Sequence, residues 1–272
     1  MSLRFHPNIS ILYPDLSFHE GVLRAAAAGF HACEFWWPLG ESVDAVAASI
    51  GQADIEVELF NFYAGDLAGG DRGFLGDPER QHLFRENVPV ALDLAARVGA
   101  RKLNALLGHR LVSLSLEEQL DLARENVTWA ADRASSIGAT ILIEAVNTFE
   151  NGPYLLPTTS AVAAFIRRVG RSNVRIQYDV YHMQRMEGNI ASTLETYMPE
   201  IGHIQIADAP DRGQPGTGEI NFRFVFGEIA RLGYRGSIGL EYRPRDATLE
   251  ESMRWLPPHA RRDGITPDEI VL

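Results

Sequence analysis

Residues 138–146 read GATILIEAV, a glycine followed by a short apolar segment that ends on an acidic side chain. The segment Thr140–Val146 is short, apolar and β-leaning, which predicts a buried β-strand. The longer amphipathic segment before it, Ser115–Ile137, is predicted to be a helix. Its first residue stands three positions before Glu118, the spacing of an N-terminal capping box, and Gly138 suits the left-handed turn at a helix end.

The same alternation of helix, glycine and strand recurs along the chain, with further glycines at positions 29, 99, 170 and 233. This alternation is typical of βαβ units around a parallel sheet. The predicted strands are Asn8–Leu12, Ala32–Trp36, Glu56–Asn61, Lys102–Leu107, Thr140–Val146, Val174–Tyr178, Gly202–Ile206 and Ser237–Glu241. The predicted helices are Phe18–Ala28, Val43–Ala53, Asp77–Val98, Ser115–Ile137, Thr159–Val169, Ile190–Met198 and Phe222–Leu232.

Eight strands is the number that closes a (β/α)8 barrel, a fold that commonly takes about 250 residues. We therefore predict a single α/β domain, a (β/α)8 TIM barrel over residues 1–256 of the 272-residue chain. The proline-containing segment 257–272 is predicted to be a C-terminal tail, poorly ordered beyond a short helix. An open doubly wound sheet is the main alternative, but Leu12–Asp15 stands where its glycine-rich dinucleotide motif is expected.

Composition narrows the classes of function. The chain is 46% hydrophobic and 22% charged, as in ordinary globular proteins, and it has no apolar run long enough to cross a membrane. Its beginning shows no apolar signal segment, and Cys33 is the single cysteine, so we expect a reducing, cytoplasmic location without a disulfide or a cysteine-rich zinc site. The net charge of −11 argues against a nucleic-acid partner. The negative net charge is compatible with a small anionic substrate, because one or two arginines suffice to bind a carboxylate.

Oxygen-bearing side chains end four consecutive predicted strands: Glu144, Asp179, Gln205 and Glu241. The intervals between them are 35, 26 and 36 residues, each about one βα unit. A single acidic residue after a strand is more often a helix cap or a solvated charge, but four at the same level are not explained in that way. Because the carboxyl ends of barrel strands meet at one face, we expect the four side chains to be neighbours.

Three converging carboxylates repel one another unless a cation lies between them. Carboxylate and amide oxygens without a thiolate favour a hard divalent ion, Mg²⁺ or Mn²⁺. Such an ion acts as a Lewis acid on a carbonyl and its neighbouring hydroxyl, while Glu144 and Glu241 transfer protons across the ring. The pattern thus indicates an isomerisation of the aldose–ketose type.

Several motifs resemble the hydroxypyruvate isomerase family of xylose-isomerase-like TIM barrels. The resemblance covers residues from about Phe5 to Trp255, and the stretch Tyr178–Glu187 is its most specific part. The motifs are Ala64–Asp66, Ile143–Asn147, Tyr178–Gly188, Gly202–Asp208, Pro215–Asn221 and Gly239–Tyr242.

This resemblance implies that Glu144, Asp179, Gln205 and Glu241 bind the metal and that the two glutamates transfer protons. Similar sugar epimerases have a histidine at the position of Gln205, so the glutamine favours the hydroxypyruvate branch. The same relatives imply substrate contacts from His182 and, in the loop after the seventh strand, from Arg212.

Other loop residues are weaker candidates. Arg72, His109 and Arg110 are alternatives to Arg212 for binding a substrate carboxylate. Two further carboxylates and five aromatic residues are candidates for substrate hydroxyl contacts and for a pocket wall, although loop charges and core packing explain them equally well. They are Glu150, Glu187, Phe35, Trp36, Trp37, Phe60 and Phe62.

The leading hypothesis is therefore a metal-dependent isomerase that interconverts hydroxypyruvate and tartronate semialdehyde, or acts on a four-carbon 2-oxo acid such as 2-oxo-tetronate. A ketose 3-epimerase, a metal-dependent endonuclease and a non-catalytic sugar-binding barrel are the alternatives. We expect a small acidic, sugar-derived substrate, no nucleic-acid or membrane partner, and a chain that is compatible with a homo-oligomer.

Overall fold

The computed structural model describes residues 1–245 and 248–272. Eight parallel strands form one sheet in the order β1-β8-β7-β6-β5-β4-β3-β2. A parallel bridge between Asn8 and Glu34 brings β1 next to β2 and completes the ring. The strands are β1 (Arg4–Pro7), β2 (Ala32–Phe35), β3 (Glu56–Asn61), β4 (Lys102–Asn104), β5 (Thr140–Glu144), β6 (Val174–Asp179), β7 (Ile201–Ile206) and β8 (Ser237–Leu240).

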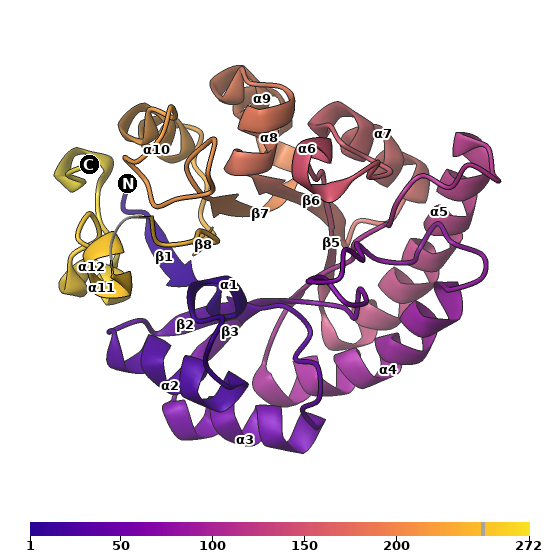
Figure 1. The fold of residues 1–272 in the computed structure, drawn as a ribbon, viewed down its shortest axis with the longest axis horizontal. Coiled ribbons are helices and arrows are strands. Elements are labelled where there is room, and N and C mark those ends of the chain that lie inside the picture. The colour runs from indigo at the N-terminus through magenta and orange to yellow at the C-terminus, as the bar shows by residue number, and fades with distance from the viewer. Residues whose placement is uncertain (246–247) are drawn as a thin grey trace.

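Helices surround the strands on the outside, which confirms the predicted (β/α)8 barrel (Figure 1). The longer ones are α2 (Phe18–Ala27), α3 (Val43–Ala53), α4 (Gln81–Val98), α5 (Leu116–Ala134), α7 (Thr159–Val169), α9 (Ile190–Tyr197) and α10 (Phe222–Arg231). Short helices are α1 (Ile9–Leu12), α6 (Thr148–Asn151), α8 (Val180–Met186), α11 (Leu249–Ser252) and α12 (Pro258–Asp263), with 3₁₀ turns η1 (Ser135–Ile137), η2 (Met198–Glu200) and η3 (Pro267–Glu269). No helix among the described residues is long and apolar enough to cross a membrane.

The first predicted strand is wrong. The segment predicted as a strand, Asn8–Leu12, instead contains helix α1, and β1 precedes it at Arg4–Pro7. The Asn8 side chain accepts a hydrogen bond from the Ser10 backbone N–H and caps this helix. A short apolar run does not distinguish a buried strand from a buried helical turn, and here the capping residue decides.

The strand register explains why the predicted ligands lie at one level. Glu144 of β5 pairs with Gln177 of β6, and Asp179 pairs with Gln205 of β7. Gln205 in turn pairs with Gly239, two residues before Glu241. Neighbouring parallel strands thus deliver their polar side chains to the same end of the barrel.

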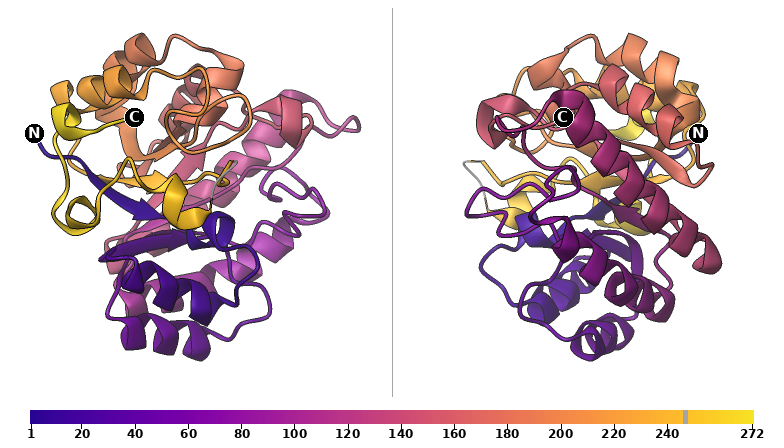
Figure 2. Two further views of the ribbon diagram at one scale, coloured as in Figure 1. Left: turned by 60° about the vertical axis from the view of Figure 1, so that its left-hand side comes forward. Right: turned by 90° about the vertical axis from the view of Figure 1, so that its right-hand side faces the viewer.

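The C-terminal segment is packed against the barrel, whereas the sequence predicted poor order there. Ile265 forms two backbone hydrogen bonds with Leu3, of 2.8 and 2.9 Å. The side chains of Ile265 and Ile270 are buried. Figure 2 shows this segment, in yellow, beside the N-terminal strand in indigo. The apolar residues of the tail therefore cover the beginning of β1.

Candidate active site

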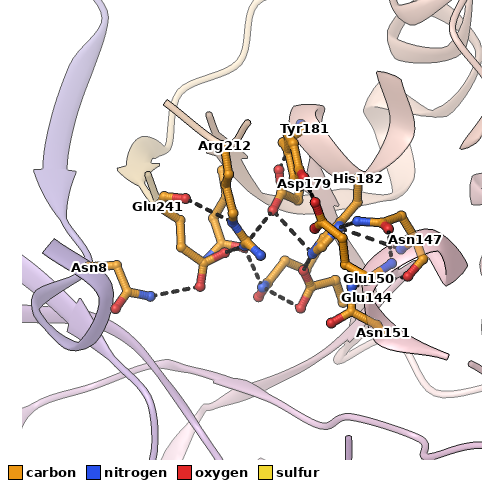
Figure 3. Close-up of polar contacts among 12 residues, drawn as sticks. Asn8, Glu144, Asn147, Glu150, Asn151, Asp179, Tyr181, His182, Arg212 and Glu241 are labelled. Carbon is orange, nitrogen blue, oxygen red and sulfur yellow. Dashed lines mark hydrogen bonds and ion pairs between the residues drawn. The ribbon is translucent and has the colours of Figure 1, made fainter. Parts of the chain in front are cut away.

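Three carboxylates meet at the carboxyl ends of the strands. Glu144 is the last residue of β5, Asp179 the last of β6, and Glu241 directly follows β8. Each of the three residues is at most 5% exposed. The guanidinium of Arg212 joins two of them, with Nη2 at 2.6 Å from Glu241 Oε2 and 3.3 Å from Asp179 Oδ2 (Figure 3). We call Glu144, Asp179 and Glu241 the rim cluster.

The fourth predicted ligand, Gln205, is connected to the rim cluster through the side-chain amide of Gln177. The Gln177 side chain donates from Nε2 to Glu144 Oε2 at 3.0 Å and to Gln205 Oε1 at 2.6 Å. Gln205 is itself 1% exposed. The structure therefore brings together all four residues that the sequence placed at the strand ends.

Burial makes the rim cluster electrostatically unfavourable as three anions. Loss of solvent, together with the neighbouring Glu241 and Asp179, raises the pKa of Glu144 well above its ordinary value. Burial also raises the pKa of Asp179, although Arg212 opposes the rise. It raises the pKa of Glu241 to about 7, again against the effect of Arg212. One guanidinium thus faces three carboxylates, and a bound divalent cation would remove the excess negative charge.

The residues present fit such a cation. The donor set contains three carboxylates and an amide oxygen, which suits Mg²⁺ or Mn²⁺. Glu144, Asp179 and His182 each offer a ligand atom, and these atoms lie within 4.8 Å of one another. Gln177 Oε1 is buried without a hydrogen-bond partner in the described part of the chain, so the amide network has an acceptor to spare.

His182 lies in the site on helix α8, three residues after Asp179. Its Nδ1 is 2.7 Å from Nδ2 of the Asn147 side chain. Nδ1 therefore accepts a hydrogen bond, and the ring proton is on Nε2. That Nε2 is 3.7 Å from Glu144 Oε1 and 3.6 Å from Asp179 Oδ2. Burial, followed by the charges of Arg212 and Arg72, keeps the pKa of His182 well below its ordinary value. The imidazole is therefore neutral, and its predicted contact with substrate remains a prediction.

Arg212 reaches the site from the loop after β7. Its backbone has a positive φ of 57°, and its Nε donates to the Glu241 carbonyl oxygen at 3.2 Å. The guanidinium also lies over the Tyr181 ring, 5.2 Å from its centroid. The carboxylates of Glu241 and Asp179 raise the pKa of Arg212 although burial acts in the opposite direction. Arg212 is thus a permanent cation beside Glu241, and its role in binding substrate is still a prediction.

A cavity of about 440 Å³ opens above these groups. The Trp36 indole forms part of its wall and donates from Nε1 to Glu241 Oε1 at 2.9 Å. Of the other aromatic candidates, Phe35 and Phe60 stack on each other in the core, 5.3 Å apart. The lining residues are Trp36, Asn61, Leu67, Ala68, Arg72, Leu106, Glu144, Val146, Glu150, Asn151, His182, Arg212, Glu241 and Arg243.

The two remaining loop carboxylates, Glu150 and Glu187, lie in different surroundings. Glu150 lines the cavity and accepts a hydrogen bond from the Tyr181 hydroxyl. Glu187 instead accepts from the backbone N–H and the hydroxyl of Thr159, at 3.2 and 2.8 Å. It holds the start of α7, as a helix-capping carboxylate does.

A second polar group lies inside the barrel beneath the rim, and the sequence did not predict it. Glu34 accepts four hydrogen bonds, from His6 and His203 at 2.8 Å each, from Gln205 at 2.6 Å and from Asn8 at 3.2 Å. We call His6, Glu34 and His203 the inner cluster; all three are 0% exposed. Burial acts to raise the pKa of Glu34, but the charges and hydrogen bonds of His203 and His6 lower it below its ordinary value.

The inner cluster is connected to the rim. Asn8 donates to Glu34 and also to Glu241 Oε1, at 3.0 Å, and Gln205 Nε2 is held by Glu34. A signal for it exists in the sequence, because His203 precedes Gln205 by two positions and so lies on the same face of its strand. His6 was missed because the first strand was predicted at the wrong residues.

A larger cavity of about 610 Å³ lies beside the first residues of β2 and β3, away from the rim cluster. Its charged lining includes Arg97, which pairs with Asp44 and Asp93. The smaller cavity, by contrast, is lined by the buried Glu144 and Glu241 of the rim cluster, so we take it as the candidate site.

Comparison with known proteins agrees with this architecture. A model of the xylose isomerase-like TIM barrel family matches residues 22–259. Hydroxypyruvate isomerase of Escherichia coli (strain K12) is 37% identical over 257 residues, which cover 94% of this chain and 99% of that protein. The 2-oxo-tetronate isomerase of Cupriavidus necator is 36% identical over 265 residues, covering 95% and 99%. A crystal structure described as AP endonuclease, family 2, from Brucella melitensis has a TM-score of 0.89 at 34% identity, covering 95% of this chain and 99% of that one.

Proposed function

We propose that this chain, which belongs to the hydroxypyruvate isomerase family of xylose isomerase-like TIM barrels, isomerises a small hydroxy-oxo acid. Hydroxypyruvate, converted reversibly to tartronate semialdehyde, is the substrate that we favour, and a four-carbon 2-oxo acid is the alternative. One observation carries the proposal: two buried glutamates, Glu144 and Glu241, line the same cavity from different strands. This arrangement allows one group to remove a proton and another to return it.

The reaction moves one proton between neighbouring carbons. One glutamate takes a proton from C3 of hydroxypyruvate, and the electron pair forms the C2–C3 double bond of an enediolate. The other delivers a proton to C2, and the hydroxyl proton of the C3 oxygen passes to the C2 oxygen, so that the C3 oxygen becomes the aldehyde carbonyl and the C2 oxygen the new hydroxyl. Figure 3 shows Glu241 on the side of Asn8 and Arg212, and Glu144 on the side of His182 and Asn147, so the two carboxylates approach a bound substrate from different sides.

The neighbours of each glutamate support these roles. Asn8 and Trp36 fix Glu241 Oε1 at 3.0 and 2.9 Å. Asn104 donates to Glu144 Oε2 at 2.8 Å, whereas Glu144 Oε1 has no hydrogen bond within the described ranges. Glu144 is thus an oriented carboxylate with one free oxygen, which suits proton transfer, and Glu241 is oriented through both oxygens, with Oε2 on Arg212.

We further propose that Glu144, Asp179, Gln205 and Glu241 hold one divalent cation, Mg²⁺ or Mn²⁺. When bound, the cation supplies Lewis-acid stabilisation of the negative charge that develops on the substrate oxygens. The chain itself excludes water from the carboxylates and holds their oxygens in one place.

The alternatives have less support. Gln205 stands where similar epimerases have a histidine, so an epimerase reaction is less well supported. An endonuclease needs a basic face for the phosphate backbone, which the net charge of −11 opposes, and a histidine-rich set of metal ligands, whereas the four ligands proposed here include no histidine. The name of the Brucella melitensis structure therefore does not extend to this chain.

The test is turnover of hydroxypyruvate by Glu144→Gln and Glu241→Gln, with Glu125→Gln on the exposed face of α5 as the control. Each active-site variant is expected to lose about 10²–10⁴-fold in kcat, because the amide cannot accept the proton. In deuterated water the wild-type protein should incorporate deuterium at C3 of recovered hydroxypyruvate. Substantial activity in both variants would remove the glutamates from proton transfer, and absence of turnover in the wild type would remove hydroxypyruvate as the substrate.

A further inference from the structure

A substrate carboxylate needs a cation in the cavity, and the four candidates from the sequence differ in position. His109 and Arg110 do not line the cavity. His109 contacts the Asn151 carbonyl oxygen at 2.7 Å, and Arg110 is bonded to the Gln119 side chain. Arg72 and Arg212 do line it.

Arg212 is already engaged. Its Nη2 contacts Glu241 and Asp179, and its Nε donates to the Glu241 backbone. Its charge therefore balances part of the rim cluster. A second anion placed on this guanidinium would share it with two protein carboxylates.

Arg72 has a different set of partners. Its Nε donates to Asn151 Oδ1 at 2.7 Å, and its Nη1 donates to the carbonyl oxygens of Leu67 and Asp71, at 2.8 and 2.6 Å. These partners are neutral. No ion pair to Arg72 occurs among residues 1–245 and 248–272, and its Nη2 has no hydrogen bond there. A ligand of the cavity therefore displaces no direct ion pair when it binds this guanidinium.

The loop that carries Arg72 is rigidly constructed. Asp71 N donates to Asp66 O and Gly73 N to Ala64 O, both at 2.9 Å. Gly73 has a φ of 95°, and a Cβ atom at this position would lie 1.8 Å from the Leu106 carbonyl oxygen. Glycine is therefore required where the loop passes the end of β4, and this close approach fixes the residue before it.

Helix α6 orients the Arg72 side chain from the other side. Asn151, its last residue, accepts from Arg72 and donates from Nδ2 to the Asn147 carbonyl oxygen at 3.0 Å. Asn147 also holds His182. The Arg72 guanidinium and the neutral His182 imidazole are thus positioned by one short helix after β5.

We propose that Arg72 binds the carboxylate of the substrate and restricts this site to hydroxy-oxo acids. The identity of the acid rests on the function proposed above, but the anion site does not. A guanidinium held by neutral partners, with donors to spare, loses little freedom when it binds an anion. Arg243 also lines the cavity, but it is exposed and its side chain has no hydrogen bond or ion pair to residues 1–245 and 248–272, so ordering it costs more entropy.

The experiment compares Arg72→Gln and Arg72→Lys with wild type, in the presence of Mg²⁺. Arg223→Gln, on the exposed side of α10, is the control for the loss of one charge. Binding of D-glycerate and of glycerol is measured by competition or calorimetry, since the two ligands differ by the carboxylate. The preference for glycerate should fall by roughly 10–100-fold in Arg72→Gln, the loss of a charge-assisted hydrogen bond, and return in part in Arg72→Lys.

In turnover, Arg72→Gln should raise KM for hydroxypyruvate with kcat little changed, which is the signature of lost ground-state binding. An unchanged preference for glycerate in a folded Arg72→Gln protein would overturn the proposal. If glycerate binding depends on Arg72 while hydroxypyruvate is not converted, the anion site stands and the proposed reaction fails. If hydroxypyruvate is converted with the same KM in wild type and Arg72→Gln, the reaction stands and the anion site fails.

Discussion

The rim cluster and the inner cluster both bury carboxylates, yet their pKa values move in opposite directions. Glu34 in the inner cluster is fully buried, and its pKa is lowered by His203 and His6 in spite of burial. Glu144 and Glu241 in the rim cluster are 5% and 4% exposed, and burial raises both pKa values. Burial alone therefore does not decide whether a carboxylate in this barrel is an anion.

The difference comes from the neighbours. The two oxygens of Glu34 accept four hydrogen bonds, which use all the acceptor positions of a carboxylate. In the rim cluster Arg212 pairs with two of the three carboxylates, Asp179 and Glu241. The inner cluster thus saturates its carboxylate, although His203 Nδ1 is buried without a hydrogen-bond partner among the described residues, whereas the rim cluster carries an excess of negative charge that a ligand can neutralise. We therefore expect the inner cluster to stabilise the barrel and the rim cluster to take part in the reaction.

The largest expected effect is on the free energy of unfolding, when one glutamate in each cluster is replaced by glutamine. In protein treated with EDTA, Glu34→Gln should lower the free energy of unfolding by about 3 kcal/mol, because an amide donor then faces donors in a buried network. Glu144→Gln should leave that free energy unchanged or raise it, since it removes one of three converging charges. Urea denaturation at pH 8 measures both.

Glu125→Gln again serves as the exposed control for this comparison. Equal destabilisation by Glu34→Gln and Glu144→Gln would mean that the two clusters are equivalent structural networks. The distinction between them would then be lost.

An effect of comparable size is expected on the pH dependence of stability. The ordinary pKa of a glutamate is 4.5, and that of Glu241 is about 7 in the folded chain without a metal. Between these values the folded state holds a proton that the unfolded state has lost, so stability falls as pH rises from 4.5 to 7. The contribution is on the order of 3 kcal/mol if the shift is fully expressed.

Buried His182 and His203 have lowered pKa values and contribute the opposite slope below their ordinary pKa of 6.5. The difference between wild type and Glu241→Gln removes the histidine contribution and reports Glu241 together with its effect on the pKa values of Glu144 and Asp179. Thermal melting in EDTA across this range should show that difference, and Mg²⁺ or Mn²⁺ should abolish it by stabilising the anion. A difference that is the same with and without the cations would argue against metal binding by Glu241.

The sequence predicted the rim better than the layer beneath it, for a physical reason. Glu144, Asp179 and Glu241 follow apolar runs, and a polar residue after such a run marks the end of a strand. Glu34 lies inside a predicted strand, where a carboxylate contradicts the apolar pattern, and its partners come from strands that are far apart in the chain. Arg72 lies in a long loop whose path depends on glycines and on contacts with β4 and α6. Neither position follows from local periodicity.

The smallest expected effect tests how the inner cluster holds its charge. His6 Nε2 donates to Glu34, and in the neutral tautomer that donates there Nδ1 accepts from the Ser237 hydroxyl, 2.7 Å away. Ser237→Ala removes this buried donor and should cost about 1 kcal/mol of stability, with kcat unchanged, because the rim cluster is not contacted. Ser136→Ala, which removes an exposed hydroxyl bonded to the Arg133 carbonyl oxygen, is the control and should have a smaller effect. If Ser237→Ala instead reduced kcat strongly, the inner cluster would take part in the reaction, and the separation between support and chemistry would not hold.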